Sequence, residues 1–114
     1  MTGEAGVVAR EPDGLLCAPE NATLTPDERR AAPGLFRALL AGPLLHELGE
    51  KNPLKILKAV RMALQSEPLL HVEELALLDA ATREPVAKKV KGPVVLAAAV
   101  KIGSVLLRDS VRFG

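Results

Sequence analysis

The chain has 114 residues, the length of a single domain, and its acidic and basic side chains nearly balance, at a net charge of +1. This balance and the scarcity of aromatic residues exclude a dedicated nucleic-acid binder, which needs basic side chains for phosphates and aromatic rings for stacking. No apolar run is long enough for a secretory signal or a membrane span, and the single cysteine cannot form an internal disulfide. We therefore predict a cytoplasmic domain with an aliphatic core and no membrane partner.

The first expected elements in chain order are a short strand and a turn. Residues 7–9 (Val-Val-Ala) are apolar, which favours a strand. Residues 10–14 then have the composition of a turn, because Pro12 sets one backbone dihedral and Gly14 permits positive φ. Residues 15–24 are expected to form an irregular loop.

A helix is predicted to follow this loop. Thr25 suits an N-cap, Pro26 suits the first helical position, and Glu28 completes a capping box. The helix is expected to run to about Ala41, because Gly42-Pro43 would end or kink it. Residues 44–48 add a further turn or two, and Gly49 is a plausible stop.

Asn52-Pro53 repeats the cap-plus-proline signal and predicts a second helix over residues 53–66. One side of this helix is expected to carry Lys55, Lys58 and Arg61. The apolar positions that fit an amphipathic period on the other side are Leu54, Leu57, Val60, Met62 and Leu64.

The second half of the chain gives mixed signals. Residues 72–81 are strong helix formers, so propensity alone predicts a helix there. Residues 86–111 look more like strands, with a turn at Lys91-Gly92-Pro93 and a possible hairpin turn at residues 102–104.

Taken singly, the reactive side chains specify no reaction. His46 and Glu50 are four apart, as on one helix face, but a metal site needs a further ligand, so a solvated surface pair is favoured. Cys17 lies in a loop where a nucleophile could sit, yet a small buried apolar group is the favoured interpretation. The basic cluster in residues 88–91 could contact phosphate, whereas a charged edge strand is favoured.

Four segments, taken in order, carry a family resemblance. They are Arg10–Leu15 (REPDGL), Leu24–Pro33 (LTPDERRAAP), the segment from Val72 through Asp79 to Pro85, and the closing segment from Gly92 through Gly103 to Asp109. Together they resemble the C-terminal domain of pantothenate synthetase (pantoate–β-alanine ligase). The resemblance covers nearly the whole chain, in register and with few gaps.

The resemblance implies an α+β fold with two or three helices packed on a small antiparallel sheet. It overrides the helical propensity of residues 72–81 and predicts that this segment is partly strand, since tertiary context often decides such conflicts. It also implies one domain over residues 1–114, with residues 1–14 forming the joint and turn after a preceding domain.

In that family the enzyme joins pantoate to β-alanine with ATP and magnesium, through a pantoyl-adenylate. Most of the active site lies on an N-terminal nucleotide-binding domain with a His-x-Gly-His type motif, and the C-terminal domain closes over ATP as a lid. The resemblance implies that the chain starts at the joint between these domains. We therefore expect no catalytic residue, no metal ligand and no ATP bound by the chain alone, and a separate nucleotide-binding synthetase domain as its partner.

The loop that meets the ATP phosphates departs from the family pattern. Where the family has Met-Ser-Ser-Arg, this chain has Cys-Ala-Pro-Glu at residues 17–20. Ala18 and Pro19 offer no side-chain donor, and Glu20 places a negative charge where a positive one would meet triphosphate. The matching positions, which are expected to keep the shape of the ATP loop without its chemistry, are Asp13, Gly14 and Asn21.

Two functions therefore stay open. The chain is either the lid half of a pantothenate synthetase, working with a separate nucleotide-binding half, or a stand-alone non-catalytic binding or structural module descended from that domain. The substitution at residues 18–20 favours the second function for the chain by itself.

Overall fold

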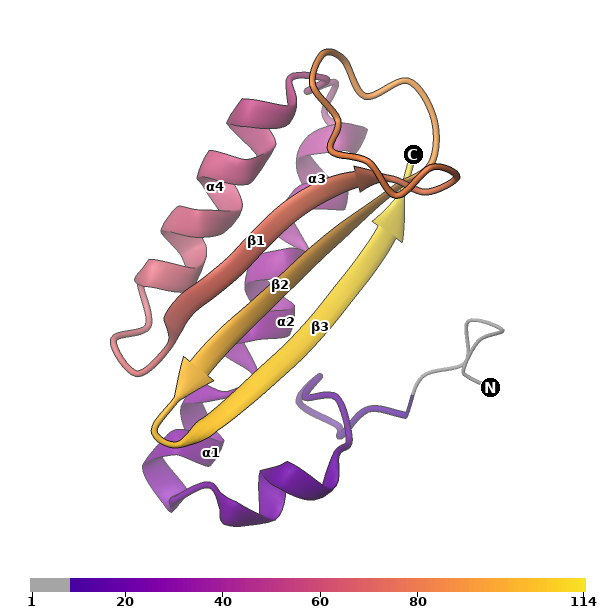
Figure 1. Ribbon diagram of the computed structural model, residues 1–114. Helices are drawn as coiled ribbons and strands as arrows, with labels where there is room; N and C mark the ends of the chain where they lie inside the picture. The colour runs from indigo at the N-terminus through magenta and orange to yellow at the C-terminus, as the bar shows by residue number, and fades with distance from the viewer. Residues whose placement is uncertain (1–8) are drawn as a thin grey trace.

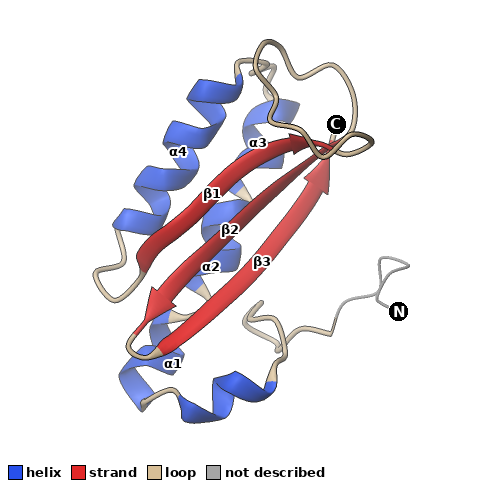
Figure 2. Ribbon diagram, in the orientation of Figure 1, coloured by secondary structure: helices blue, strands red, loops and turns tan. Residues whose placement is uncertain are grey.

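The computed structural model describes residues 9–114, and within them helices occupy the first half of the chain and strands the second (Figure 1). The sheet has three strands in the antiparallel order β1-β2-β3. Helices α2, α3 and α4 cover one of its faces (Figure 2). The α+β class that the resemblance implied is thereby confirmed. The elements are the 3-10 helix η2 (Pro19–Thr23), α1 (Pro26–Ala31), α2 (Gly34–Leu39), α3 (Ala41–Glu47), α4 (Pro53–Gln65), β1 (His71–Asp79), β2 (Val94–Ile102) and β3 (Val105–Phe113).

The predicted start of the first helix is confirmed in atomic detail. The Thr25 side chain accepts a hydrogen bond from the Glu28 amide at 3.2 Å, and the Glu28 carboxylate accepts one from the Thr25 amide at 2.9 Å. The predicted extent, to about Ala41, is wrong. Helix α1 ends at Ala31 because Pro33 has no N–H to continue the ladder, and the chain re-enters helical geometry as α2.

Gly42 and Pro43, predicted to end or kink the helix, do not end the helical stretch, which is interrupted at Leu40 and continues as α3. They lie in the first turn of α3, where a missing N–H costs nothing because the first amides of a helix have no intrahelical acceptor. Gly42 is required there, since a Cβ would lie 2.6 Å from a methyl group of Leu96. The helix ends instead before Gly49, which has a φ of +101° and fits the predicted stop.

The Thr25→Ala substitution is expected to lower the free energy of unfolding by about 1 kcal/mol, because it removes the N-cap acceptor of α1. Thr23→Ala is the matched control, because the exposed Thr23 hydroxyl only donates to the Glu20 carbonyl at 2.8 Å. Urea denaturation of both variants measures the difference. Equal losses at the two positions would contradict the assigned role of the cap.

The second predicted helix is confirmed as α4, one residue shorter than expected. Its N-cap Asn52 accepts a hydrogen bond from the Leu54 amide at 2.9 Å. The predicted core face is partly wrong, because Leu54 and Met62 are 73% and 61% exposed. The buried residues recur every three or four positions and so define one stripe, and the two exposed side chains lie on other sides of the helix. The buried stripe of α4 consists of Pro53, Ile56, Val60 and Leu64.

The second half folds into the sheet. Residues 71–79 form β1, so the strand that the resemblance implied is confirmed and the helix favoured by propensity is wrong. The strands predicted within residues 86–111 are confirmed as β2 and β3, and the predicted turn at residues 91–93 precedes β2, but residues 86–90 are wrong as strand because they belong to the loop between β1 and β2. There the amide of the buried Val90 donates to the Lys51 carbonyl. The hairpin between β2 and β3 turns at Gly103, with φ +59°, as predicted.

The core is aliphatic, as the composition predicted. The inward side chains of the strands meet the buried faces of α2 and α4, and the largest fully buried side chains include Leu39, Ile56, Leu64, Leu77 and Leu96. On the outer face of the sheet, Glu74 of β1 and Arg108 of β3 form an ion pair with an N–O distance of 3.1 Å. The register places this pair across Ala99 of the central strand, whose small side chain is buried beneath it. No helix within residues 9–114 combines the length and the apolar character that a membrane crossing requires.

Candidate functional site

The first part of the candidate site is a tight turn over residues 10–16. Arg10 and Leu16 form an antiparallel bridge, and the Glu11 amide donates to the Leu15 carbonyl at 2.8 Å. Gly14 has a φ of +97°, as the predicted turn requires, and a Cβ on it would lie 2.7 Å from the Phe36 ring. The turn therefore packs directly on α2. Most of the strand predicted before it lies outside the described residues.

Asp13 fastens this turn to α1. Its carboxylate accepts hydrogen bonds from the Arg29 guanidinium at 2.8 and 3.3 Å and from the Leu15 amide at 3.3 Å. The hydrogen bond from Arg29 is the main reason that the pKa of Asp13 lies below its ordinary value. The carboxylate is thus already occupied by protein donors.

Arg10 fastens the turn to the sheet. Its guanidinium makes two hydrogen bonds to the Asp109 carboxylate, at 2.7 and 2.9 Å, and a third to the Gly14 carbonyl at 3.0 Å. It also lies over the Phe36 ring, 3.9 Å from the centroid. The Asp109 side chain is only 5% exposed. Sequence reasoning assigned neither partner a role, although both residues lie in segments that carry the family resemblance.

Cys17 follows the turn and is exposed, so the prediction of a buried thiol is wrong. The Cys17 amide is bound to the Ala9 carbonyl, and its thiol donates to the Glu11 carboxylate at 3.4 Å. This hydrogen bond to Glu11 raises the pKa of the thiol. Cys17 is therefore not an activated nucleophile, because activation requires a lowered pKa.

The next four residues, Ala18 to Asn21, belong to the loop that the family resemblance led us to expect at the ATP phosphates. Ala18 precedes η2 and offers no side-chain cap, and Pro19 occupies its first position. The Glu20 carboxylate forms no ion pair with any residue from 9 to 114. Asn21 donates from Nδ2 to the Leu16 carbonyl at 2.9 Å, whereas its buried Oδ1 has no hydrogen-bond partner in that same range.

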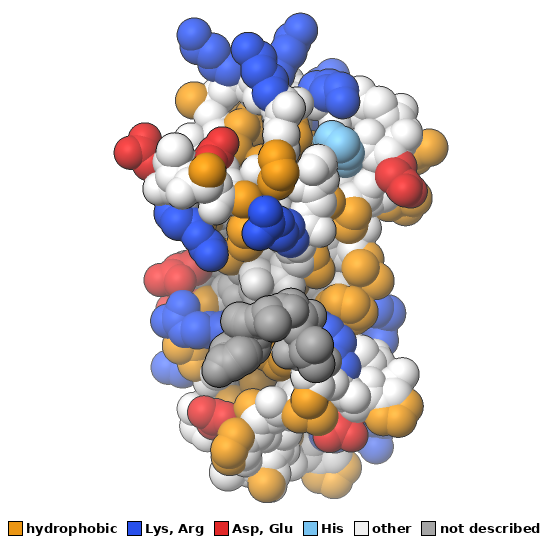
Figure 3. Space-filling model, turned by 90° about the vertical axis from the view of Figure 1, so that its right-hand side faces the viewer, with side chains coloured by type: hydrophobic (Ala, Val, Ile, Leu, Met, Phe, Trp, Pro, Cys, Tyr) orange, Lys and Arg blue, Asp and Glu red, His pale blue; other side chains and the backbone are white. Residues whose placement is uncertain are grey.

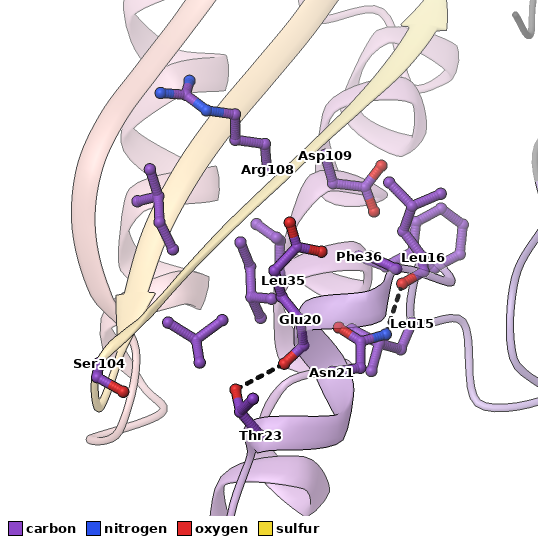
Figure 4. A pocket seen from close by; sticks show the side chains of 14 residues that line it. Leu15, Leu16, Glu20, Asn21, Thr23, Leu35, Phe36, Ser104, Arg108 and Asp109 are labelled. Atoms are coloured by element: carbon purple, nitrogen blue, oxygen red, sulfur yellow. Dashed lines mark hydrogen bonds between the residues drawn. The ribbon is translucent and has the colours of Figure 1, made fainter.

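These residues line a cavity of about 630 Å³ between η2, the start of α2 and β3 (Figure 4). Figure 4 shows the Glu20 side chain extending across the opening toward β3, and the amide of Asn21 between Leu16 and the cavity. The cavity lining combines aliphatic side chains, among them Leu15 and Leu35, with the charged side chains of Glu20, Arg108 and Asp109. The structure thus brings Asn21 to the cavity, while Asp13 and Gly14 support the turn behind it.

The other candidate residues do not form a site. His46 lies on α3 with its ring 5.5 Å from that of Phe113, and Glu50 follows the helix stop, so the predicted shared helix face is wrong. The described residues include no cluster of three His, Cys, Asp or Glu side chains that could hold a metal ion. The basic cluster of residues 88–91 lies in the loop before β2, so it is not a charged edge strand. Figure 3 shows Lys and Arg side chains gathered at that end of the molecule.

The comparisons with known proteins agree with one another. A family model described as pantoate-beta-alanine ligase matches residues 4–112. The pantothenate synthetase of Moorella thermoacetica is 37% identical over 102 residues, which are 90% of this chain and 36% of that protein. That of Agrobacterium fabrum is 38% identical over 105 residues, which are 92% of this chain and 36% of that protein.

The crystal structure of pantothenate synthetase from Thermus thermophilus superposes with a TM-score of 0.83 and 31% sequence identity, over 91% of this chain and 37% of that one. This chain therefore spans a little over a third of the length of the proteins that it matches. Since the family match extends over nearly all of its residues, the chain belongs to the pantoate–β-alanine ligase family.

Proposed function

We propose that this chain is the C-terminal lid domain of a pantothenate synthetase and acts only together with a nucleotide-binding synthetase domain. The observation that carries the proposal is the superposition on a synthetase structure over 91% of this chain but 37% of the longer protein. The remaining length of such relatives has room for a second domain. An ATP-dependent biosynthetic reaction of this kind also favours a cytoplasmic location.

In the proposed reaction, the pantoate carboxylate attacks the α-phosphate of ATP and releases pyrophosphate. The amine of β-alanine then attacks the acyl carbon and releases AMP. Magnesium would accompany the nucleotide in the complete enzyme. The 114 residues contain two histidines, His46 and His71, and neither belongs to a His-x-Gly-His motif. The groups that position pantoate and the α-phosphate must therefore come from the partner domain.

The part of this domain in the reaction would be to close over the nucleotide. We infer that Asp13, Gly14 and Asn21 keep the shape of the closing loop. The carboxylate of Asp13 is occupied by Arg29 and by the Leu15 amide, which supports a scaffold role and not magnesium binding. The loop chemistry differs, since Glu20 would present a negative charge to the triphosphate.

The purified chain is expected to show no ATP-dependent condensation of pantoate with β-alanine and no adenylate formation. The measurement is pyrophosphate exchange into ATP, with protein made in a host that lacks its own synthetase. The full-length Moorella thermoacetica relative is the positive control. Exchange by the chain alone, at a rate that tracks its concentration through purification, would overturn the proposed division between two domains.

The alternative is a stand-alone module without catalytic function, and the substitution at residues 18–20, which replaces the donors of the family's loop, favours it. Calorimetric titration of ATP separates the two functions. Heat of binding that appears only when the chain is mixed with a nucleotide-binding synthetase domain supports the lid. If ATP binds neither to the chain alone nor more tightly to the mixture than to the synthetase domain by itself, the result supports the stand-alone module.

A further inference from the structure

We propose that one end of the molecule is a docking surface for an acidic segment of a partner protein. The surface is formed by the connection between α3 and α4 and by the loop that precedes β2. It shares no lining residue with the cavity beside η2, so the inference does not depend on the proposed lid function. We call it the lysine surface, after Lys51, Lys88, Lys89 and Lys91.

The lysines gather around two adjoining hollows, of about 560 and about 470 Å³. Lys51 and Lys89 line both hollows, Lys88 lines the larger one and Lys91 the smaller one. All four are exposed, and none forms an ion pair within residues 9–114. Figure 3 shows the resulting concentration of basic side chains at this end of the molecule. The two hollows therefore form one continuous basic surface.

Two carboxylates lie at this surface and do not neutralise it. Glu50 lines the larger hollow, and its carboxylate accepts a hydrogen bond from the Asn52 amide at 3.1 Å. Gly114 lines the smaller hollow. Neither forms an ion pair with a lysine within residues 9–114. The excess of ammonium groups over carboxylates favours an acidic partner, because complementary charge speeds association and selects partners.

The backbone that carries the lysines is fixed by contacts within the fold. The Val90 amide donates to the Lys51 carbonyl at 2.9 Å, which joins the two loops. The Val90 side chain, between Lys89 and Lys91 in the chain, is only 2% exposed and belongs to the core. Asn52 follows Lys51 directly and caps α4. The charges are thus carried on a frame that exists before a partner arrives, which reduces the free energy lost in ordering the surface.

The distribution of the charges and the apolar content of the surface indicate what kind of anion it fits. A single phosphate is held by donors that converge on one point, whereas these ammonium groups are spread over two hollows. An extended acidic segment can present a carboxylate to each hollow. Leu54 lines the larger hollow and is 73% exposed, so an apolar side chain of the same segment would pack against it.

Nucleic acid and anionic membranes fit the lysine surface less well. The chain has two phenylalanines and no tyrosine or tryptophan, and neither phenylalanine lines a hollow, so unpaired bases would find no such ring to stack on. A flat bilayer would meet projecting ammonium groups but would leave both hollows unfilled. The surface is therefore assigned to a protein segment, and binding of the other two classes is the contrary result of the test.

The test is a fluorescence-anisotropy titration of a labelled peptide, Glu-Glu-Leu-Glu-Glu, with the full chain. Saturable binding is expected at low ionic strength. A peptide with glutamine in place of each glutamate is expected to bind at least about tenfold more weakly. Raising the salt concentration from about 50 to about 500 mM is expected to weaken binding by a similar factor, because salt screens exposed charges. Equal binding of the glutamine peptide, or the absence of saturable binding, would overturn the proposal.

Paired substitutions test whether binding is local to the lysine surface. Lys51→Gln with Lys89→Gln removes the two charges that both hollows share and is expected to weaken peptide binding about tenfold. Arg61→Gln with Lys101→Gln is the matched control, since both residues are exposed, form no ion pair within residues 9–114 and line neither hollow. Equal weakening in the two double variants would show attraction by net charge alone and would contradict the docking surface.

Competition distinguishes the classes of partner. Vesicles of phosphatidylserine with phosphatidylcholine, and a short oligothymidylate, are each added to the labelled peptide complex at equal concentrations of negative charge. The unlabelled peptide is expected to displace the label at a lower concentration of charge than either competitor. Displacement by vesicles or oligonucleotide at a lower concentration than the peptide would overturn the assignment to an acidic protein segment.

Discussion

Arg10→Met is expected to lower the free energy of unfolding by roughly 2–4 kcal/mol, because it leaves the Asp109 carboxylate buried without its counter-ion. Arg10 is itself 21% exposed, so the loss falls at or below the value for a fully buried pair. Methionine keeps an apolar stem against the Phe36 ring, so the substitution mainly removes the charge and its donors. Urea denaturation, with the midpoint and slope compared between variants, measures the effect.

Arg108→Met is the matched control, because Arg108 lies on β3 next to Asp109 and also forms an ion pair. Its partner is Glu74, and both side chains are about two-thirds exposed, at 64% and 67%. Removing this pair is therefore expected to cost less than about 1 kcal/mol. Replacing both members of the buried pair, as Arg10→Met with Asp109→Leu, should recover much of the lost stability. Equal losses in Arg10→Met and Arg108→Met would show that Arg10 does not anchor the turn.

The local features of the fold were predictable from the sequence. Thr25 and Asn52 are predictable as N-caps because a cap is a contact between residues two or three apart in the sequence. Pro33 carries an equally local signal for the end of α1, whereas the Gly42-Pro43 pair predicts a later end than the structure has. Local spacing does not indicate that Gly42 is needed for close packing on Leu96 of the sheet.

Features that depend on distant residues could not be predicted from local patterns. Residues 71–79 have helical propensity but pair with β2 along nearly their whole length, so tertiary contacts decide their conformation. Only the family resemblance anticipated this strand. Arg10 and Asp109 are 99 residues apart, and no spacing rule joins two charges across the length of a domain.

Some features of the candidate site could be predicted from the sequence, and others depend on packing. The turn at Gly14 and the loss of donors at residues 18–20 follow directly from the residue types. The hydrogen bonds of the Asn21 amide and the exposure of Cys17 do not, because they depend on how η2 lies against α2 and β3. A free Cys is often buried, but here the backbone bond to Ala9 holds the residue at the surface.

The second large effect is expected from giving residues 18–20 the family's loop sequence in a fusion with a nucleotide-binding domain. This chain would be fused to the nucleotide-binding domain of the Moorella thermoacetica relative, once with its own loop and once with Ala18→Ser, Pro19→Ser and Glu20→Arg. If the domain acts as the proposed lid, the restored loop supplies two hydroxyls and a guanidinium to the triphosphate in place of a carboxylate. Donors of this kind are worth a few kcal/mol at developing phosphate charge, so turnover is expected to rise about a hundredfold or more.

Steady-state rates of the two fusions, measured at saturating and at limiting ATP, show whether the loop acts on catalysis or on nucleotide binding. A gain that persists at saturating ATP indicates stabilisation of the transition state, whereas a gain confined to limiting ATP indicates ground-state binding of the nucleotide. Glu73→Arg in the native-loop fusion is the control, because it makes the same change of charge on β1, away from the loop. Equal turnover with native and restored loops would show that residues 18–20 do not meet ATP.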